Sequence, residues 1–528
     1  MMTLGRAAAA IGSTSMISRF AGFARDALIA ALFGAGPLAD ALVAALAIPN
    51  LIRRAVGEGA LNAAFTPIFA RRRHERGKAS ARRFSAAALK AALPVMLLLA
   101  GAIAVFAGPL IMLIASGFAP GGDQLLQAGE LLRIMAPAIA LTGIMAALAA
   151  ALNAEARVGA AAVAAMLFNV FLVLALVGME IADAPPTFAS ARIFAFAVSA
   201  AALLQLGVLA AASRRFTWRL MLMPADWTAP DARAFASRMW PGLIVSAMPH
   251  LALLAGLQTL SAHGAALAPL YYADRLFQLP LGVMSAVIGI ALLPVISGQL
   301  QAGERAAALE GGKRVIALSL ALTLPAAVAF WMLSDVITAV LFERGAFTRQ
   351  DTLSTAMFLK VLGLGLPAAG LSRMLLAYAW AREGAWLPLW ICLAALAGGF
   401  AAARMLADTG PAAAALAITV ANVLFAGGLA LMLWRQGLKL ADAPLLAVCA
   451  ALAVCCLVMA AALHAMLPLA AGWLQSGSSA LKAAALVMLC LAGAAVFGLA
   501  LLMARAIAPG PLRRLFAISA LPREAGLS

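Results

Sequence analysis

Apolar residues in this chain recur in runs of about 20, separated by short polar stretches, from one end of the sequence to the other. There are about fourteen such segments, centred near residues 18, 53, 100, 140, 168, 200, 248, 282, 328, 364, 396, 422, 456 and 494. An α-helix of this length spans the roughly 30 Å hydrocarbon core of a bilayer. The runs lack the alternating ten-residue pattern of a membrane barrel, so they predict an all-α polytopic membrane protein.

The loops between these segments differ in charge. Loops rich in Lys and Arg follow the second, sixth, eighth and twelfth segments. The alternate loops 34–39, 116–128, 180–190, 262–269 and 467–480 contain neither residue, and loop 343–351 contains only Arg344 and Arg349. The positive-inside rule therefore places both termini in the cytoplasm and predicts an even number of crossings.

A weak internal repeat divides the chain. The second segment ends in TPIFARRRHERGKASARRF, and the eighth ends in LPVISGQLQAGERAAALEGGKRV. Each of these stretches is followed by an apolar run and then by a turn that contains glycine. We expect two six-helix lobes in a parallel pseudo-twofold repeat, an arrangement that favours alternating access to a cavity between them. The predicted divisions are residues 1–215 (N-lobe), 216–440 (C-lobe), 441–510 (two C-terminal helices) and 511–528 (cytoplasmic tail).

The composition supports a membrane protein and argues against nucleic acid or a metal ion as its partner. The chain is 65% hydrophobic and 11% charged, with a mean hydropathy of +1.01, which excludes a soluble domain. Its net charge of +17 is explained by the positive-inside rule, and without aromatic–basic interleaving we expect no nucleic-acid partner. The five cysteines lie in apolar segments without zinc-ligand spacing, so we expect small hydrophobes and no metal site.

One face of the second segment is polar where a membrane helix is normally apolar. We expect one helix over residues 38–70, bent at Pro49 and Gly57, in which Arg53 lies roughly 21 Å from the outer end. That depth is near the bilayer midplane, where a lone arginine costs roughly 2.5–3.5 kcal/mol. The face comprises Asn50, Arg53, Arg54, Gly57, Glu58 and Asn62. The excess of arginine over carboxylate predicts an anionic ligand.

Other apolar segments carry further charged side chains. Arg19 and Asp26, seven residues apart, share a face of the first helix, with Arg25 beside them. Asp40 lies at the outer end of the second helix, and we expect it to pair with Arg25 as an outer gate. The eighth segment adds Tyr271, Asp274, Arg275 and Gln278, and the tenth adds Arg373.

Each of these groups of charged residues can also be explained by a role in stability without any role in binding a ligand. The second helix could hold a closed ion-pair network, with Arg54 and Glu58 one turn apart. Arg275 and Arg373 could extend their charges to the membrane surface. His250, after Pro249, is a proton relay or a satisfied core histidine. The sequence contains no P-loop or nucleophile motif, so we expect no cofactor and energy from the membrane potential or a monovalent cation.

Four stretches of the chain resemble the lipid II flippase family (MurJ, also called MviN). They are SRFAGFARDALIAALFGAGPLADAL, IPNLIRRAVGEGALNAAFTPIF, YYADRLFQLPLGV and IALLPVIS. Their order, their spacing and the fourteen-helix layout extend the resemblance over essentially the whole chain.

The resemblance implies a transporter, not an enzyme, of the multidrug/oligosaccharidyl-lipid/polysaccharide exporter superfamily in the bacterial inner membrane. It would move the undecaprenyl-diphosphate-linked peptidoglycan precursor to the periplasmic leaflet for cell-wall synthesis, with the cell-wall machinery as partner and a lipid-tail groove at helices 13 and 14. The implied substrate-binding residues are Arg19, Arg25, Arg53, Arg54 and Arg275, the gating or ion-pair residues are Asp26, Asp40, Glu58 and Asp274, and the supporting residues are Asn50, Tyr271, Gln278 and Arg373.

The chain departs from the family at Gln278, where members carry Glu, whereas Asn153, Arg157 and Asn169 fit. Two rival functions stay open at this point. A drug/cation antiporter of the same superfamily predicts an anionic cavity and has no need of two extra helices. A lipid-linked intramembrane glycosyltransferase predicts catalytic carboxylates or a metal at a membrane face, often with a large loop.

The loop charges give a direct test of topology. A cysteine introduced at Lys78, in a chain that lacks the five native cysteines, should resist a membrane-impermeant maleimide in intact cells, because the positive-inside rule places it in the cytoplasm. A cysteine in loop 467–480 should react. Labelling of residue 78 from outside would disprove the fourteen-helix arrangement.

Overall fold

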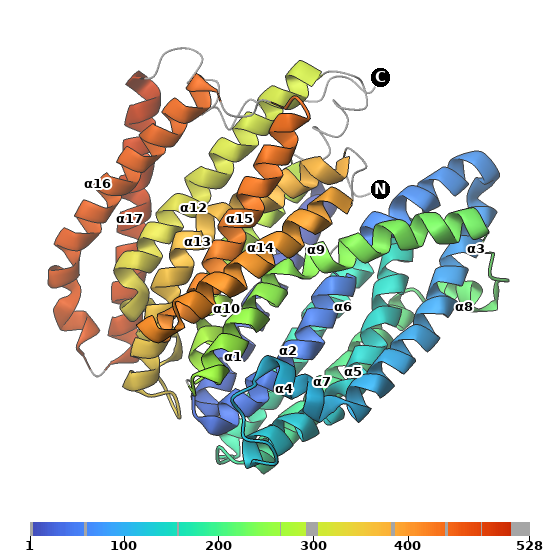
Figure 1. The fold of residues 1–528 in the computed structure, drawn as a ribbon, viewed down its shortest axis with the longest axis horizontal. Helices are drawn as coiled ribbons and strands as arrows, with labels where there is room; N and C mark the ends of the chain where they lie inside the picture. The colour runs from blue at the N-terminus through green and yellow to red at the C-terminus, as the bar shows by residue number, and fades with distance from the viewer. Residues whose placement is uncertain are drawn as a thin grey trace.

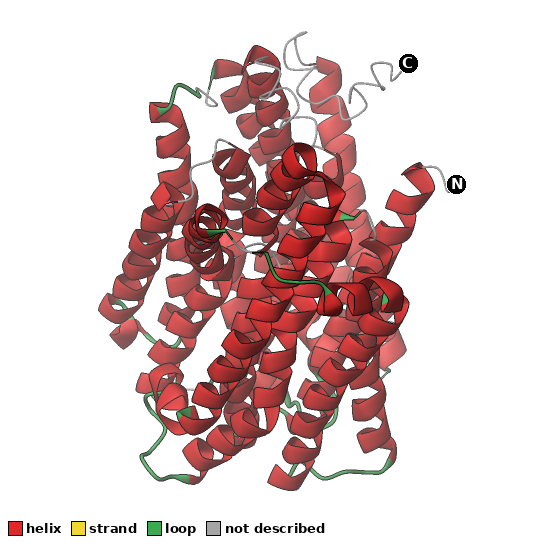
Figure 2. Ribbon diagram, turned by 90° about the vertical axis from the view of Figure 1, so that its right-hand side faces the viewer, coloured by secondary structure: helices red, strands yellow, loops and turns green. Residues whose placement is uncertain are grey.

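The computed structural model describes residues 4–57, 61–155, 158–226, 228–264, 266–291, 305–381, 386–438, 442–476 and 478–507. Every regular element within these ranges is helical, which confirms the predicted fold class. Figures 1 and 2 show long helices that cross one bundle between two ends, with short connections at each end.

Eleven described helices contain segments long and apolar enough to span a membrane. They are α3 (Leu61–Val105), α5 (Asp123–Ala154), α6 (Val158–Ile181), α7 (Phe188–Ala212), α9 (Ala229–Ala262), α12 (Arg305–Phe342), α13 (Arg349–Ala381), α14 (Trp386–Met405), α15 (Ala412–Arg435), α16 (Ala443–Leu474) and α17 (Ser479–Ile507). The shorter elements are α4 (Ala107–Ile114), α8 (Arg214–Leu222) and η2 (Ala407–Thr409).

Three more helices are 30, 19 and 24 residues long and carry charged side chains within their apolar stretches: α1 (Leu4–Phe33), α2 (Pro37–Ala55) and α10 (Ala268–Ala291). Added to the eleven, they give the fourteen that the sequence predicts. They carry the charged residues of the predicted site, and Figure 1 shows them in the middle of the bundle. Neighbouring helices therefore shield their charges from lipid.

The described residues cover the second predicted helix in two parts. α2 ends at Ala55 and is followed by a wider helical turn at Val56 and Gly57, and α3 begins at Leu61. Residues 58–60 lie outside the described residues. Pro49 lies inside α2. α3 continues to Val105 through the predicted cytoplasmic loop 71–83, with one non-helical residue, Gly77, at φ 78°. Glycine adopts this conformation without steric cost, so the basic segment is a bent helix instead of a loop.

The packing of the helices groups neighbours in sequence. α1 packs on α6, α2 and α3 on α5, and α5 on α7, while α13 packs on α12, α15 and α10. α9 contacts α2 and α3 as well as α14 and α15, so it joins the two groups. α16 and α17 pack on each other and on α12 at one edge of the bundle. The exact lobe boundaries remain a prediction.

A buried charge cluster fastens the basic part of α3 to the start of α9. Arg72 is only 1% exposed; its Nε donates to Asp231 at 2.8 Å and its Nη1 to the carbonyl of Asp226 at 3.1 Å. Arg71 and the Thr228 hydroxyl donate to the same Asp231 carboxylate, at 2.5 and 2.6 Å. Burial opposes the ionisation of Asp231, but the hydrogen bonds from Thr228 and Arg72 outweigh it and hold its pKa below its ordinary value.

Removing one partner of this cluster should destabilise the protein. We expect Asp231→Asn to lower the free energy of unfolding by about 3 kcal/mol, because the buried Arg72 loses its buried counter-ion and keeps only the more exposed Asp226 carboxylate, 3.3 Å away. Because the pKa of Asp231 is depressed on folding, this contribution is present above the ordinary pKa of the carboxyl and is lost as pH falls through the folded value.

Thermal unfolding in detergent at pH 7 measures this effect. The control is Glu130→Gln, which removes an exposed partner of Arg192 and should change stability by about 0–1 kcal/mol. An equal melting temperature for Asp231→Asn and the wild type would contradict the role of the cluster.

Candidate functional site

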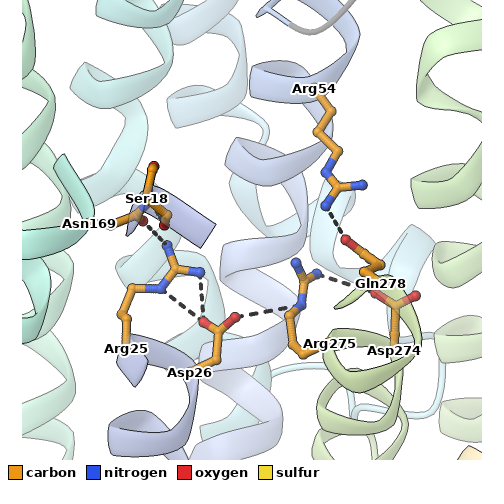
Figure 3. A network of polar contacts seen from close by, with 8 residues as sticks. All are labelled: Ser18, Arg25, Asp26, Arg54, Asn169, Asp274, Arg275 and Gln278. Atoms are coloured by element: carbon orange, nitrogen blue, oxygen red, sulfur yellow. Dashed lines mark hydrogen bonds and ion pairs between the residues drawn. The ribbon is translucent and has the colours of Figure 1, made fainter. Parts of the chain in front are cut away.

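The charged side chains of α1, α2 and α10 meet in one polar network (Figure 3). In α1, the Nε and Nη2 of Arg25 donate to Oδ1 of Asp26 at 2.9 and 2.7 Å. Nη1 of Arg25 donates to Oδ1 of Asn169 at 3.2 Å, and the Asn169 amide donates to the carbonyl and hydroxyl of Ser18 at 3.1 and 3.2 Å. α6 thereby fixes the direction of the Arg25 guanidinium.

The network continues from α1 into α10 and then α2. Asp26 lies between Arg25 and Arg275 (Figure 3), with its Oδ2 3.9 Å from Nε of Arg275. Nη2 of Arg275 is 3.5 Å from Asp274. Gln278 donates to Asp274, and Arg54 donates to Gln278. Arginines thus alternate with aspartates and one glutamine across α1, α10 and α2, and α10 is far in sequence from the other two.

Burying the charged side chains of this network would cost much free energy if their charges did not compensate one another. Arg25, Asp26, Asp274 and Arg275 are all buried, and each ion removed from water incurs a desolvation penalty of several kcal/mol. The guanidinium of Arg275 also lies 4.4 Å from the ring centroid of Tyr271, a cation–π contact. Arg275 therefore does not extend to the membrane surface, and that interpretation was wrong.

A pocket opens beside the network, toward the first group of helices. Its polar lining comes from Arg25, Asn50, Arg53, Thr142 and Gln205, which lie on α1, α2, α5 and α7. Phe168 and Leu172 of α6 are among its apolar residues, and Tyr271 of α10 closes one side. Two guanidinium groups and several neutral donors thus face the same space, an arrangement suited to an anion with polar substituents.

The two remaining arginines of the predicted site lie against α10. A methyl group added at Gly282 would come within 2.3 Å of Nη1 of Arg19, so the exposed Arg19 side chain occupies the space that this glycine leaves. Nη1 of Arg373 is 3.4 Å from the carbonyl of Leu281. Both cations therefore reach the helix that carries Arg275.

Asp40 does not pair with Arg25, which corrects our expectation of that gate. Its Oδ1 accepts the backbone N–H groups of Leu267 and Ala268, both at 2.8 Å, at the start of α10. The first N–H groups of a helix have no partner within it and carry positive partial charge, so a carboxylate is favoured there. Arg25 is instead held by Asp26 and Asn169.

Close backbone contacts surround this cap and join α1 to the loop after α12. The N–H of Ala346 donates to the carbonyl of Ala31 at 2.7 Å, and the Tyr272 hydroxyl donates to the carbonyl of Gly34 at 3.0 Å. Gly345 has φ 58°, and an added methyl group there would lie 2.3 Å from the Ala31 carbonyl. We call these contacts and the Asp40 cap the outer seal, because the loop charges predict that this end of the bundle faces outward.

Some predicted partners lie elsewhere than expected or were missed. Glu58 is outside the described residues, so its pairing with Arg54 stays a prediction. Arg54 also bonds Gln278, the position where the sequence departs from the family. Asn169 was noted as fitting the family but not predicted as a partner of Arg25. The feature of the sequence that could have predicted this contact is that Asn169 is a single amide side chain within an otherwise apolar helix.

Comparison with known proteins decides the family. The family model described as lipid II flippase MurJ matches residues 29–484. A probable lipid II flippase MurJ of Rhizobium tropici is 36% identical over 83% of this chain and 82% of its own length. One from Rhizobium meliloti is 33% identical over 94% of this chain and 92% of its own length.

The chain belongs to the MurJ lipid II flippase family. A solved MurJ structure in an inward closed conformation matches with a TM-score of 0.73 at 18% identity, covering 94% of this chain and 99% of the other. An inward-facing multidrug transporter of the MATE family matches with a TM-score of 0.65 at 16% identity, covering 83% of this chain and all of the other. These two likenesses show the shared fold, whereas the MurJ family match distinguishes this chain from the drug antiporters.

In this MurJ-family chain, the cap formed by Asp40 should hold the outer seal closed. Asp40→Ala removes the acceptor of two buried N–H groups, each of which costs about 1–3 kcal/mol when left unpaired. Asp40→Asn keeps an acceptor oxygen and should have a smaller effect. We therefore expect outward opening to increase from wild type to Asn to Ala.

A cysteine at Ala31, in a background without native cysteines, measures the opening, because Ala31 is buried at the seal. Its rate of reaction with an impermeant maleimide should follow the same order. A cysteine at the exposed Gly36 is the control and should react at one rate in all three proteins. Equal rates at position 31 would show that Asp40 is only a local structural anion.

Proposed function

We propose that this protein moves lipid II, the undecaprenyl-diphosphate-linked disaccharide-pentapeptide, from the cytoplasmic to the outer leaflet of the bacterial inner membrane by alternating access. The observation that carries the proposal is the convergence of arginine side chains on one network and pocket of a MurJ-family chain. Arg25 and Arg275 contact the carboxylates of Asp26 and Asp274. Arg54 bonds the amide of Gln278, and Arg53 lines the adjacent pocket.

A diphosphate suits this excess of positive charge. A guanidinium presents its N–H groups in a planar fork that binds phosphate oxygens in pairs. Arg25 and Arg53 line the pocket, and the amides of Asn50 and Gln205 offer neutral donors and acceptors for sugar or peptide groups. Burial strengthens each of these contacts because little water competes with them.

The C-terminal helices fit the lipid part of such a substrate. Large apolar side chains are exposed along both α16 and α17, including Leu457, Leu469, Leu491 and Leu502. We propose that the groove for the undecaprenyl tail lies along these two helices while the headgroup enters the pocket. Binding of the two parts in different places lets the headgroup cross without removing the tail from the lipid.

The network also offers a means of coupling the substrate to the conformation. Asp26 on α1 and Arg275 on α10 are 3.9 Å apart, close enough for attraction but longer than a direct hydrogen bond. A bound diphosphate would compete with Asp26 and Asp274 for the same guanidinium groups and so alter the attraction between the two helices. We propose that the membrane potential or a monovalent cation supplies the energy.

Loss of a cavity arginine should reduce transport. We expect Arg19→Ala, Arg25→Ala and Arg275→Ala each to slow flipping a hundredfold or more, because a charge-assisted contact in a water-poor site typically contributes several kcal/mol. Lysine at these positions should restore only part of the rate, since it keeps the charge but loses the fork.

The assay uses purified protein in vesicles with lipid II in the inner leaflet and an impermeant reagent that modifies only headgroups on the outside. Arg192→Ala, which removes an exposed side chain paired with Glu130, is the control and should flip at the wild-type rate. Full activity of all three cavity variants would refute diphosphate recognition. A new covalent product instead of leaflet movement would favour the glycosyltransferase.

A further inference from the structure

One buried histidine remains outside the network described above. The chain has four histidines, and His74, His263 and His464 are exposed. His250, on α9, is only 2% exposed. Within the described part of the chain, neither of its ring nitrogens has a hydrogen-bond partner.

His250 lies deep in the bundle and close to the arginines of the site. It is 12 residues from the end of α9 at Ala262, which is roughly 18 Å along the helix. Arg53 and Arg54 of α2, Arg275 of α10 and Arg373 of α13 all act on it electrostatically. α9 packs against both α2 and α10, which carry three of these four arginines, so His250 lies on a helix that adjoins the site.

The chemistry of these neighbours defines the missing partner. Buried polar atoms are nearly always hydrogen-bonded, and an exception calls for an explanation. A neutral imidazole has one N–H donor and one acceptor nitrogen, whereas a guanidinium has only donors. The surrounding arginines therefore cannot accept the imidazole N–H. The partner it lacks is an acceptor, and among cations the favoured acceptor is an anionic oxygen.

We propose that His250 is a substrate-contacting residue that donates a hydrogen bond to a phosphate oxygen of the bound lipid diphosphate. The inference rests on the proposed function, because it takes the diphosphate to be the anion held by the arginines. Arg53, Arg54 and Arg275 supply the charge, and His250 adds a neutral donor from a fourth helix, α9. A neutral donor of fixed position selects for the geometry of the anion more than for its charge.

Binding of farnesyl diphosphate, a short soluble polyprenyl diphosphate, tests the contact with purified full-length protein. We expect His250→Leu to weaken binding about tenfold and His250→Gln, which keeps an N–H donor, to weaken it less. The melting temperature without ligand should not fall in either variant, since neither ring nitrogen bonds the protein. His464→Leu, at an exposed position on α16, is the matched control and should bind like the wild type.

Imidazole NMR gives a readout that a purely structural role would not change. In a variant with His74, His263 and His464 replaced by Gln, the ring ¹⁵N signals belong to His250 alone and should shift when farnesyl diphosphate is added. Farnesyl diphosphate binding equal to wild type in His250→Leu, together with unshifted ring signals, would overturn the role of His250 while leaving the proposed function intact. Wild-type protein that neither binds this ligand nor moves lipid II would instead refute the proposed function.

Discussion

The cost of placing charge in a medium without water governs the centre of this protein. α1, α2 and α10 are the three long helices that carry the charged side chains of the network. They can cross a bilayer only if other helices surround them and if their arginines and aspartates compensate one another. The chain from Asn169 through Arg25, Asp26 and Arg275 to Gln278 and Arg54 meets that condition.

The arrangement of the charges in this network bears on the proposed function. A set of ion pairs that left no polar group available would fix the helices in one arrangement and leave nothing for a ligand. Here Arg25 and Arg53 line a pocket beside the network. On the adjoining helix α9, neither ring nitrogen of His250 has a hydrogen-bond partner within the described residues. Under the proposed function, a bound diphosphate meets both the guanidinium groups and the imidazole.

Contacts between the predicted lobes are concentrated at two levels of the bundle. At the outer seal, Asp40 holds the first N–H groups of α10, and the backbone of α1 meets the loop after α12. At the other level, Arg72 of α3 holds Asp231 at the start of α9. Aromatic packing accompanies the polar contacts at both levels. Phe342 packs on Phe23 and Tyr272 at the outer seal, and Phe84 packs on Phe235 beside Arg72.

The sequence was sufficient for the helices and for the class of ligand, because both follow from local composition. Runs of about 20 apolar residues require helices in lipid, and charges near the middle of such runs require a polar interior. It was not sufficient for the path of the backbone at Gly77, where a helix bends instead of ending. Helical periodicity also could not show that the Arg25 guanidinium turns back to its neighbour Asp26.

The partners of the charged residues were decided only by the tertiary structure. Asp40 and Arg25 both lie near the outer ends of their helices, and their opposite charges suggested a pair. The fold instead brings the start of α10 to Asp40 and Asn169 of α6 to Arg25. Such choices depend on distances of a few ångströms between segments more than 100 residues apart, which no local pattern encodes. The sequence determined which charges must be buried, and the packing of the helices determined what each of them meets.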